Sequence, residues 1–228
     1  MRIHVAVVGL IRSFSNCLPS IEQKAIDYLP KFPGISVTTS FHLSRSHGPL
    51  SNPRTDEFQP PEYDIGKLIE NYPHYFFEIE QLREESAPLF RHALDHGEWL
   101  EAGGRNLRNY LESLTLLKKA GEQLTAFPAD AYLFLRPDVR LIDPYFPING
   151  LTVSKRYVLT PRWGRWGGLN DRMAMVPSHY ASDYFSRIDS VKDFLDQHGP
   201  LHPERHLAFA LRGARHKAVL RFEAVRIR

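Results

Sequence analysis

A group of charged residues follows an apolar stretch in the second half of the chain. Residues 131–135 have the continuous apolar character of a strand covered on both faces. Immediately after them come Arg136, Asp138 and Arg140. Because ligands of open α/β sheets bind beyond the carboxyl ends of the strands, Asp138 could bind Mg²⁺ or Mn²⁺ on a diphosphate, and the arginines could neutralise its phosphates. Local spacing alone favours a plainer alternative, a polar turn with an Arg–Asp pair at the surface.

Two tryptophans, Trp163 and Trp166, stand in a glycine-containing loop between two predicted strands. The flat apolar face of a tryptophan can stack on a sugar ring, and glycines such as Gly168 let the backbone approach a ligand closely. Asn170 and Asp171 supply polar groups at the start of the following strand. Asp171 could act as a general base toward an acceptor hydroxyl, or it could only accept a hydrogen bond from a sugar.

Asp171 also has a simpler interpretation, as a turn aspartate paired with Arg172, which we would prefer without the neighbouring tryptophans. A further acidic candidate, Glu204, follows Pro203 at the start of a predicted helix, where proline suits the first turn. Glu204 could reach an acceptor pocket, but its position favours a capping or solvated role.

Two pairs of histidines are spaced four residues apart, His92 with His96 and His202 with His206. This spacing can place two imidazoles on one helical face, as a zinc site requires. Neither pair has the glutamate of a zinc-protease motif in the correct position, so the spacing alone does not predict a zinc site. Cys17 is not a candidate nucleophile, because no histidine is placed by the sequence to activate it.

The candidate residues need a scaffold of strands and helices. Residues 2–9 are typical of a buried strand, 15–29 of a helix and 35–41 of a second strand, an order that suits a right-handed crossover between parallel strands. Residues 105–124 place Leu107, Tyr110, Leu111, Leu114 and Leu117 on one stripe, which predicts a core-facing helix. Further predicted elements are a proline-rich loop or lid over 44–63, an interrupted helical segment over 65–97, strands at 157–159, 173–176 and 218–227, and short helices near 178–187, 190–197 and 203–212.

The length and composition fit one globular domain, with 228 residues of which 43% are hydrophobic. A single cysteine leaves no internal disulfide and makes the cytoplasm the expected location. The net charge of +3 admits an acidic partner such as a sugar nucleotide, whereas the spread of the basic residues gives no reason to expect nucleic-acid binding. The stretch after Gly9 lacks the glycines of a dinucleotide or Walker loop, which argues against a dehydrogenase or a P-loop kinase.

Three segments together resemble a group of GT-A-like glycosyltransferases of polysaccharide and glycan assembly, some of them encoded by bacteria and large algal viruses. They are YLFLRPDVR at 132–140, GGLNDRMA at 167–174 and VAVVGLIRSF at 5–14. The resemblance implies an α/β fold of the GT-A type, with a Rossmann-type mixed central sheet flanked by helices. It also implies a single domain, with a donor-nucleotide half over about 1–140 and an acceptor half over about 141–228.

The resemblance further implies roles for individual residues. Gly9 and Arg12 would lie near the nucleotide, Asp138 would occupy the metal or diphosphate position of an Asp-x-Asp motif, and Asp171 would face the donor sugar or the acceptor. Arg136 stands where that motif has its first aspartate. A metal would therefore have one carboxylate ligand fewer, and Arg136 could provide the positive charge itself. The substrate-binding candidates are Trp163, Trp166, Gly168, Asn170, Arg172 and Glu204, and Arg136, Arg140 and Asp171 are the catalytic candidates.

The implied activity is transfer of a sugar from a UDP- or GDP-linked donor to a hydroxyl of a glycan or lipid-linked acceptor, with Mn²⁺ or Mg²⁺ as the cofactor if the site binds a metal. A lipid-linked acceptor leaves room for a peripheral membrane contact. The alternative is a noncatalytic carbohydrate- or nucleotide-binding module of the same fold, which would bind a donor without turning it over.

Overall fold

The computed structural model describes most of the chain. It covers residues 1–11, 13–45, 50–52, 57–59, 65–100, 103–143, 156–220 and 224–226. Arg12 and most of the proline-rich segment 44–63 lie outside these residues, so the predicted lid is not tested. Within that segment the structure describes two short antiparallel strands, β3 (Leu50–Asn52) and β4 (Glu57–Gln59).

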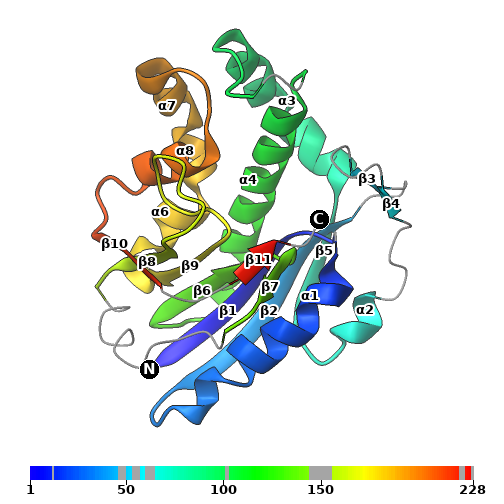
Figure 1. The fold of residues 1–228 in the computed structure, drawn as a ribbon, viewed down its shortest axis with the longest axis vertical. Helices are drawn as coiled ribbons and strands as arrows, with labels where there is room; N and C mark the ends of the chain where they lie inside the picture. Colours follow the sequence, from blue (N-terminus) through cyan, green and yellow to red (C-terminus); the bar gives the residue numbers. More distant parts are fainter. Residues whose placement is uncertain are drawn as a thin grey trace.

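Seven strands of the described chain form one mixed sheet in the order β10-β8-β9-β6-β1-β2-β5 (Figure 1). In chain order they are β1 (Arg2–Leu10), β2 (Ser36–Arg45), β5 (His74–Glu78), β6 (Ala131–Leu135), β8 (Val158–Pro161), β9 (Met173–Pro177) and β10 (His216–Leu220). β1 pairs in parallel with both β2 and β6, as the crossover predicts. β9 runs antiparallel to β6 and to β8, so the sheet is mixed and the predicted fold class is confirmed.

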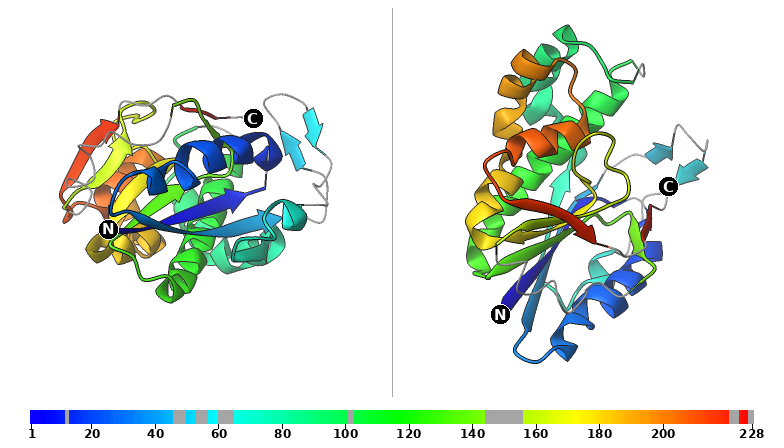
Figure 2. Two further views of the ribbon diagram at one scale, coloured as in Figure 1. Left: turned by 90° about the horizontal axis from the view of Figure 1, so that it is seen from below. Right: turned by 60° about the vertical axis from the view of Figure 1, so that its left-hand side comes forward.

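Helices cover both faces of the sheet (Figure 2). Because successive side chains of a strand point to opposite faces, β1 contributes to two cores. Val5 packs on one face with α1 (Phe14–Ile21), which continues as a π-helical turn over Glu22–Ile26. Ala6 packs on the other face with the long helix α4 (Arg105–Gln123), where the predicted leucine stripe is buried.

A third apolar cluster lies where α3 (Ile79–Asp95), α4 and α7 (Val191–His198) meet, at the upper end of the molecule in Figure 1. The helices α6 (Ala181–Phe185) and α8 (Pro203–Ala210) pack beside α4 and α7. Shorter elements are α2 (Ile65–Leu68) and the 3-10 turns Leu29–Lys31, Leu124–Ala126, Ser178–Tyr180 and Arg187–Ser190. Among the helices that the structure describes, none combines the length and the apolar character needed to cross a bilayer.

The structure corrects two of the predicted elements. The segment 65–97 is not helical throughout, because β5 lies within it and pairs in parallel with β2 at the edge of the sheet. Its aromatic sequence suits a strand, but it runs directly into α3, so the apolar pattern shows no boundary. The single strand predicted at 218–227 is also wrong. β10 pairs with β8, whereas β11 (Ala224–Arg226) pairs with β7 (Val139–Leu141) in a separate two-stranded sheet.

Candidate active site

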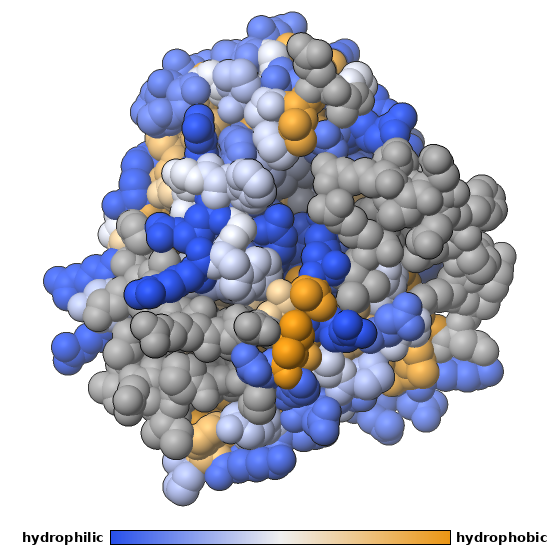
Figure 3. Space-filling model, viewed as in Figure 1, coloured by the Kyte–Doolittle hydropathy of each residue, from blue (hydrophilic) through white to orange (hydrophobic). Residues whose placement is uncertain are grey.

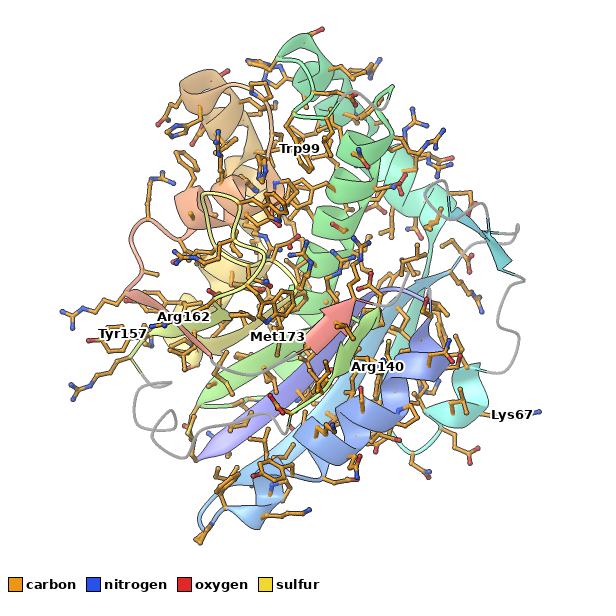
Figure 4. The ribbon with its side chains drawn as sticks, in the orientation of Figure 1. Lys67, Trp99, Arg140, Tyr157, Arg162 and Met173 are labelled. Atoms are coloured by element: carbon orange, nitrogen blue, oxygen red, sulfur yellow. The ribbon has the colours of Figure 1, made fainter. Side chains whose placement is uncertain are left out.

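The two charged clusters predicted from the sequence meet at one edge of the sheet. β6 ends at Leu135 and β9 begins at Met173, and these residues pair in the antiparallel ladder. The backbone N–H of Arg136 extends the ladder by donating to the carbonyl oxygen of Arg172 at 3.1 Å. The turn after β6 therefore lies beside the residues that precede β9, close to Met173 in Figure 4. This edge is the carboxyl edge of the parallel strands, where ligands of open α/β sheets bind.

Asp138 is buried at this edge and is held by two arginines. Arg136 donates from Nε to Oδ1 at 3.0 Å and from Nη2 to Oδ2 at 2.9 Å. Arg226, which faces Val139 in the β7–β11 pair, donates from Nε to Oδ2 at 2.8 Å. Burial alone would raise the pKa of Asp138, but the charges of the two guanidinium groups outweigh it and lower the pKa to about 2. Asp138 is therefore a carboxylate at neutral pH.

Asp171 lies between two further arginine side chains. Its Oδ2 is 3.9 Å from Nη1 of Arg136, and its Oδ1 is 3.6 Å from Nη1 of Arg172. Oδ1 is buried and makes no hydrogen bond with any described residue. Nη1 of Arg172 also lies 3.4 Å from Oε1 of Glu204. We call the side chains that alternate in charge along this edge the charged row: Arg226, Asp138, Arg136, Asp171, Arg172 and Glu204.

Glu204 lies in the first turn of α8, just after Pro203. Burial, together with the negative charge of Asp171, raises the pKa of Glu204 to about 7, although the charge of Arg172 acts in the opposite direction. Glu204 can therefore hold or release a proton near neutral pH. His202 Nδ1 lies 3.3 Å from Oε2 of Glu204, and burial lowers the pKa of this imidazole.

The charged row presents its basic groups to solvent. The side chains of its arginines are 18 to 27% exposed, whereas those of its carboxylates are 5 to 9% exposed. The arginine side chains of the row are thus more accessible than its acids.

Buried hydrogen bonds and a close backbone contact hold the loop before β9. Asn170 is buried, and its Nδ2 donates to the carbonyl oxygen of Trp163 at 2.6 Å while its Oδ1 accepts from the N–H of Arg172 at 2.9 Å. The amide of Asn170 therefore holds the shape of the loop. Gly168 lies against the start of α8, because a Cβ at this position would be 2.0 Å from the carbonyl oxygen of Glu204. Only glycine allows this close approach of two backbone segments.

The two tryptophans differ in exposure. Trp163 is half-buried, and the guanidinium of Arg172 lies 5.8 Å from the centre of its ring, in cation–π range. Trp166 is 70% exposed and has a φ of 40°. A left-handed conformation is uncommon for a bulky residue, and such strain tends to occur at functional sites. The exposed indole is available for stacking on a ligand.

Gly9 reaches the site, whereas Arg140 does not join the charged row. A Cβ on Gly9 would lie 2.6 Å from Cδ of Pro137, so the end of β1 lies against the turn that carries Asp138. Arg140 is exposed on β7 (Figure 4) and lines, with Lys24, a separate hollow of about 420 Å³ between α1 and β7. Arg12 lies outside the described residues.

Apolar surface borders this region of the molecule. Ile142, just after β7, is 40% exposed, and Val225 of β11 is 37% exposed. Figure 3 shows a short hydrophobic stretch near the centre of the face, at the place that β7 and β11 occupy in Figure 1, with hydrophilic residues around it. The strand pair that brings Arg226 to Asp138 thus also presents apolar side chains to solvent.

A divalent cation does not fit the residues around Asp138. Mg²⁺ and Mn²⁺ require several oxygen ligands, but both oxygens of Asp138 accept hydrogen bonds from guanidinium groups. Arg136 occupies the sequence position that would supply a second carboxylate, and Asp171 faces Arg136 and Arg172. The donor set at this edge is suited to anions.

Sequence reasoning missed Arg226, which lies 88 residues from Asp138 along the chain and has no local motif. The predicted core residue Tyr110 has a polar role as well, because its hydroxyl lies 2.9 Å from Nδ1 of His206. Nε2 of His206 lies 3.1 Å from the hydroxyl of Ser190, and burial lowers the pKa of this imidazole to about 3. His206 is thus a neutral, hydrogen-bonded core residue.

Comparison with known proteins identifies the fold. No family model and no curated protein matches the chain. An active-site mutant of LgtC aligns with a TM-score of 0.50 and 12% identity over 95% of this chain and 72% of that one. The galactosyltransferase LgtC with donor and acceptor sugar analogs aligns with a TM-score of 0.48 and 12% identity, over 95% of this chain and 73% of that one. Apo mouse xyloside xylosyltransferase 1 aligns with a TM-score of 0.46 and 11% identity, over 96% of this chain and 85% of that one. The chain has a GT-A-type mixed α/β fold.

Proposed function

We propose that this protein is a glycosyltransferase that moves a sugar from a nucleoside diphosphate sugar to a hydroxyl of a glycan or lipid-linked acceptor. The observation that carries the proposal is the charged row, in which partly exposed arginine side chains are paired with buried carboxylates at the carboxyl edge of a GT-A-type sheet. Nucleotide ligands of open α/β sheets bind at this edge. The sequence motifs that resemble glycosyltransferases fall on the same residues.

In this proposal the arginines bind and stabilise the diphosphate. Arg136, Arg172 and Arg226 have fixed orientations, since each contacts a buried carboxylate of the row. Such preorganised cations stabilise a leaving group as its charge develops, without reorganisation during the reaction. Because the residues at Asp138 do not fit a divalent cation, we propose that the arginines supply the positive charge and that a chelator leaves the activity unchanged.

The transfer step then requires a place for one proton. The oxygen of the acceptor forms a bond to the anomeric carbon of the sugar, the bond from that carbon to the phosphate oxygen breaks with its electron pair, and the nucleoside diphosphate departs. For transfer with inversion, we assign the acceptor's proton to Asp171, whose Oδ1 has no hydrogen-bond partner among the described residues. Glu204, with its pKa raised to about 7, can donate a hydrogen bond to a substrate oxygen when protonated.

The sugar and the acceptor would contact the loop before β9. Trp166 offers an exposed indole face at this loop, and sugar rings stack on such faces. The exposed Ile142 and Val225 beside Arg226 give an apolar surface that suits the lipid part of a lipid-linked acceptor.

A second candidate is a noncatalytic module that binds a nucleotide or glycan. One observation favours it: Asp138 and Asn170, two residues expected to touch a ligand, use their polar groups within the protein. A binding module would retain affinity for a nucleotide but show no turnover with any acceptor.

The experiment is a donor screen by calorimetry with UDP- and GDP-linked sugars, followed by assays for released nucleoside diphosphate with and without acceptor. We expect Arg172→Gln to weaken donor binding at least tenfold, and Asp171→Asn to keep binding while losing turnover. Arg2→Gln is the matched control, because Arg2 is exposed at the opposite end of β1. Donor binding without turnover for the unmodified protein would favour the binding module, and equal binding by Arg172→Gln and Arg2→Gln would contradict the site.

A further inference from the structure

A second polar cluster lies outside the charged row, where the end of α3 meets α7 (Figures 1 and 2). His92 and His96 stand one helical turn apart, with ring centres separated by 4.9 Å. Asp196 of α7 faces them, and its Oδ1 lies 3.5 Å from Nε2 of His96. One ligand atom from each of the three residues lies within 4.8 Å of the others. The helices α3 and α7 thus bring together two imidazoles and a carboxylate.

The backbone fixes which nitrogen of His96 faces Asp196. Nδ1 of His96 lies 3.1 Å from the carbonyl oxygen of His92. A carbonyl oxygen only accepts, so Nδ1 carries the hydrogen and Nε2 of the neutral ring has a lone pair directed at a carboxylate oxygen. Two acceptors that face each other repel unless a proton or a metal ion lies between them. Histidines that bind metals are commonly oriented by this kind of hydrogen bond to a carbonyl group.

His92, in the same cluster, has an unsatisfied ring nitrogen. Its Nε2 is buried and makes no hydrogen bond with any residue that the structure describes. Buried polar atoms without a partner are uncommon, because losing water without a replacement is unfavourable. A metal ion coordinated by this nitrogen would satisfy it.

The separation between His96 and Asp196 suits a tetrahedral metal site. Zinc lies about 2.0 to 2.2 Å from nitrogen and oxygen ligands, which places neighbouring ligand atoms of a tetrahedron roughly 3.3 to 3.5 Å apart. The distance of 3.5 Å between His96 and Asp196 matches this spacing. It is longer than an ordinary N–H to oxygen hydrogen bond, which spans about 2.7 to 3.2 Å.

We propose that His92, His96 and Asp196 form a binding site for Zn²⁺, with water as the fourth ligand. Imidazole ligands favour zinc over the hard cations Mg²⁺ and Ca²⁺. The side chain of Asp196 is 63% exposed, so an ion can enter from solvent and keep a water ligand. The site would join α3 to α7 and stabilise their contact. It is separate from the charged row, and its occupancy does not depend on the proposed transferase activity.

The test uses the full chain without an affinity tag, freed of metal with a chelator and titrated with ZnCl₂ by calorimetry and thermal unfolding. We expect one zinc ion per chain. At a zinc concentration about one hundred times Kd, the melting temperature should rise by about 5 to 10 °C. His96→Gln should abolish saturable binding. Asp196→Asn, a change at an exposed position, should weaken binding at least tenfold while the protein stays folded.

The control is His179→Gln, which removes an exposed histidine outside the cluster and should bind zinc as the unmodified protein does. Absorption of bound Co²⁺ in the visible range gives a second readout, because tetrahedral Co²⁺ absorbs intensely there. This absorption should be lost in the same variants. The proposal is overturned if the unmodified protein shows no saturable binding, or if His96→Gln or Asp196→Asn binds zinc as tightly as His179→Gln.

Discussion

Replacing Asp138 by asparagine tests whether this residue is the centre of an ion-pair network. The pKa of Asp138 is lowered from 3.8 to about 2 in the folded protein. At about 1.4 kcal/mol per pKa unit, this difference corresponds to roughly 2 to 3 kcal/mol of stability from the charged form. Because the folded pKa is depressed, this contribution is present above pH 3.8 and is lost as the pH falls through about 2. Asp138→Asn should therefore lower the free energy of unfolding by about this amount at pH 7.

The assay is urea unfolding at pH 7, with thermal unfolding as a second measurement. For a domain of this size, the loss corresponds to a fall in melting temperature of about 5 to 10 °C. Removing one partner from a fully buried ion pair costs about 3 to 5 kcal/mol. We expect the smaller loss derived from the pKa, because the side chains of Arg136 and Arg226 are partly exposed. The control Asp193→Asn, at an exposed position, should change stability by only a few tenths of a kcal/mol. An Asp138→Asn variant as stable as the unmodified protein, but with lost Mn²⁺-dependent activity, would refute the ion-pair account and identify a metal ligand.

Three further predictions concern the loop, the buried histidines and the proton on Glu204. Gly168→Ala should destabilise the protein by about 1 to 3 kcal/mol in urea unfolding, because its Cβ would meet the carbonyl oxygen of Glu204, and an unchanged midpoint would contradict that contact. Burial lowers the pKa values of His4, His42 and His206 to about 4, 3 and 3. Below pH 6.5 the unfolded chain therefore binds protons that the folded chain does not, and each histidine should lower the free energy of unfolding by on the order of 2 kcal/mol at pH 5. The raised pKa of Glu204 has the opposite effect on the pH dependence of stability, so the unfolding free energy should be measured in the Glu204→Gln variant. A stability that does not change between pH 7 and 5 in this variant would contradict the prediction for the histidines. Donor binding to the unmodified protein should strengthen as the pH is lowered from 8 to 6, since a protonated Glu204 adds no negative charge, and Glu204→Gln should remove this dependence in calorimetry.

The sequence predicts the central scaffold well where local pattern and burial agree. The apolar run at 131–135 and the leucine stripe at 105–124 become β6 and α4, because continuous or periodic burial is visible in the residues themselves. The sequence singles out Arg136 and Asp171 as candidates, but the antiparallel pairing of β6 with β9, which the sequence does not predict, is what brings them together. Gly9 reaches the same edge because β1 ends beside β6.

Local sequence patterns do not predict contacts between segments that are distant along the chain. Arg226 meets Asp138 only because β11 pairs with β7, and three residues of strand carry too little pattern to predict that pairing. The sequence places Arg140 with Arg136 because both follow β6, but β7 carries Arg140 toward α1 instead. In the same way β5 was missed, because its pairing with β2 and not its own sequence separates it from α3.

The most direct test of the central claim is a calorimetric titration of the unmodified protein with UDP- and GDP-linked sugars in the presence of EDTA. The account predicts selective binding of one donor, with an affinity that added Mn²⁺ does not change and that Arg172→Gln weakens at least tenfold. Binding that appears only when Mn²⁺ is present would contradict the arginine-based site, and the absence of binding to every donor would contradict the proposed function itself.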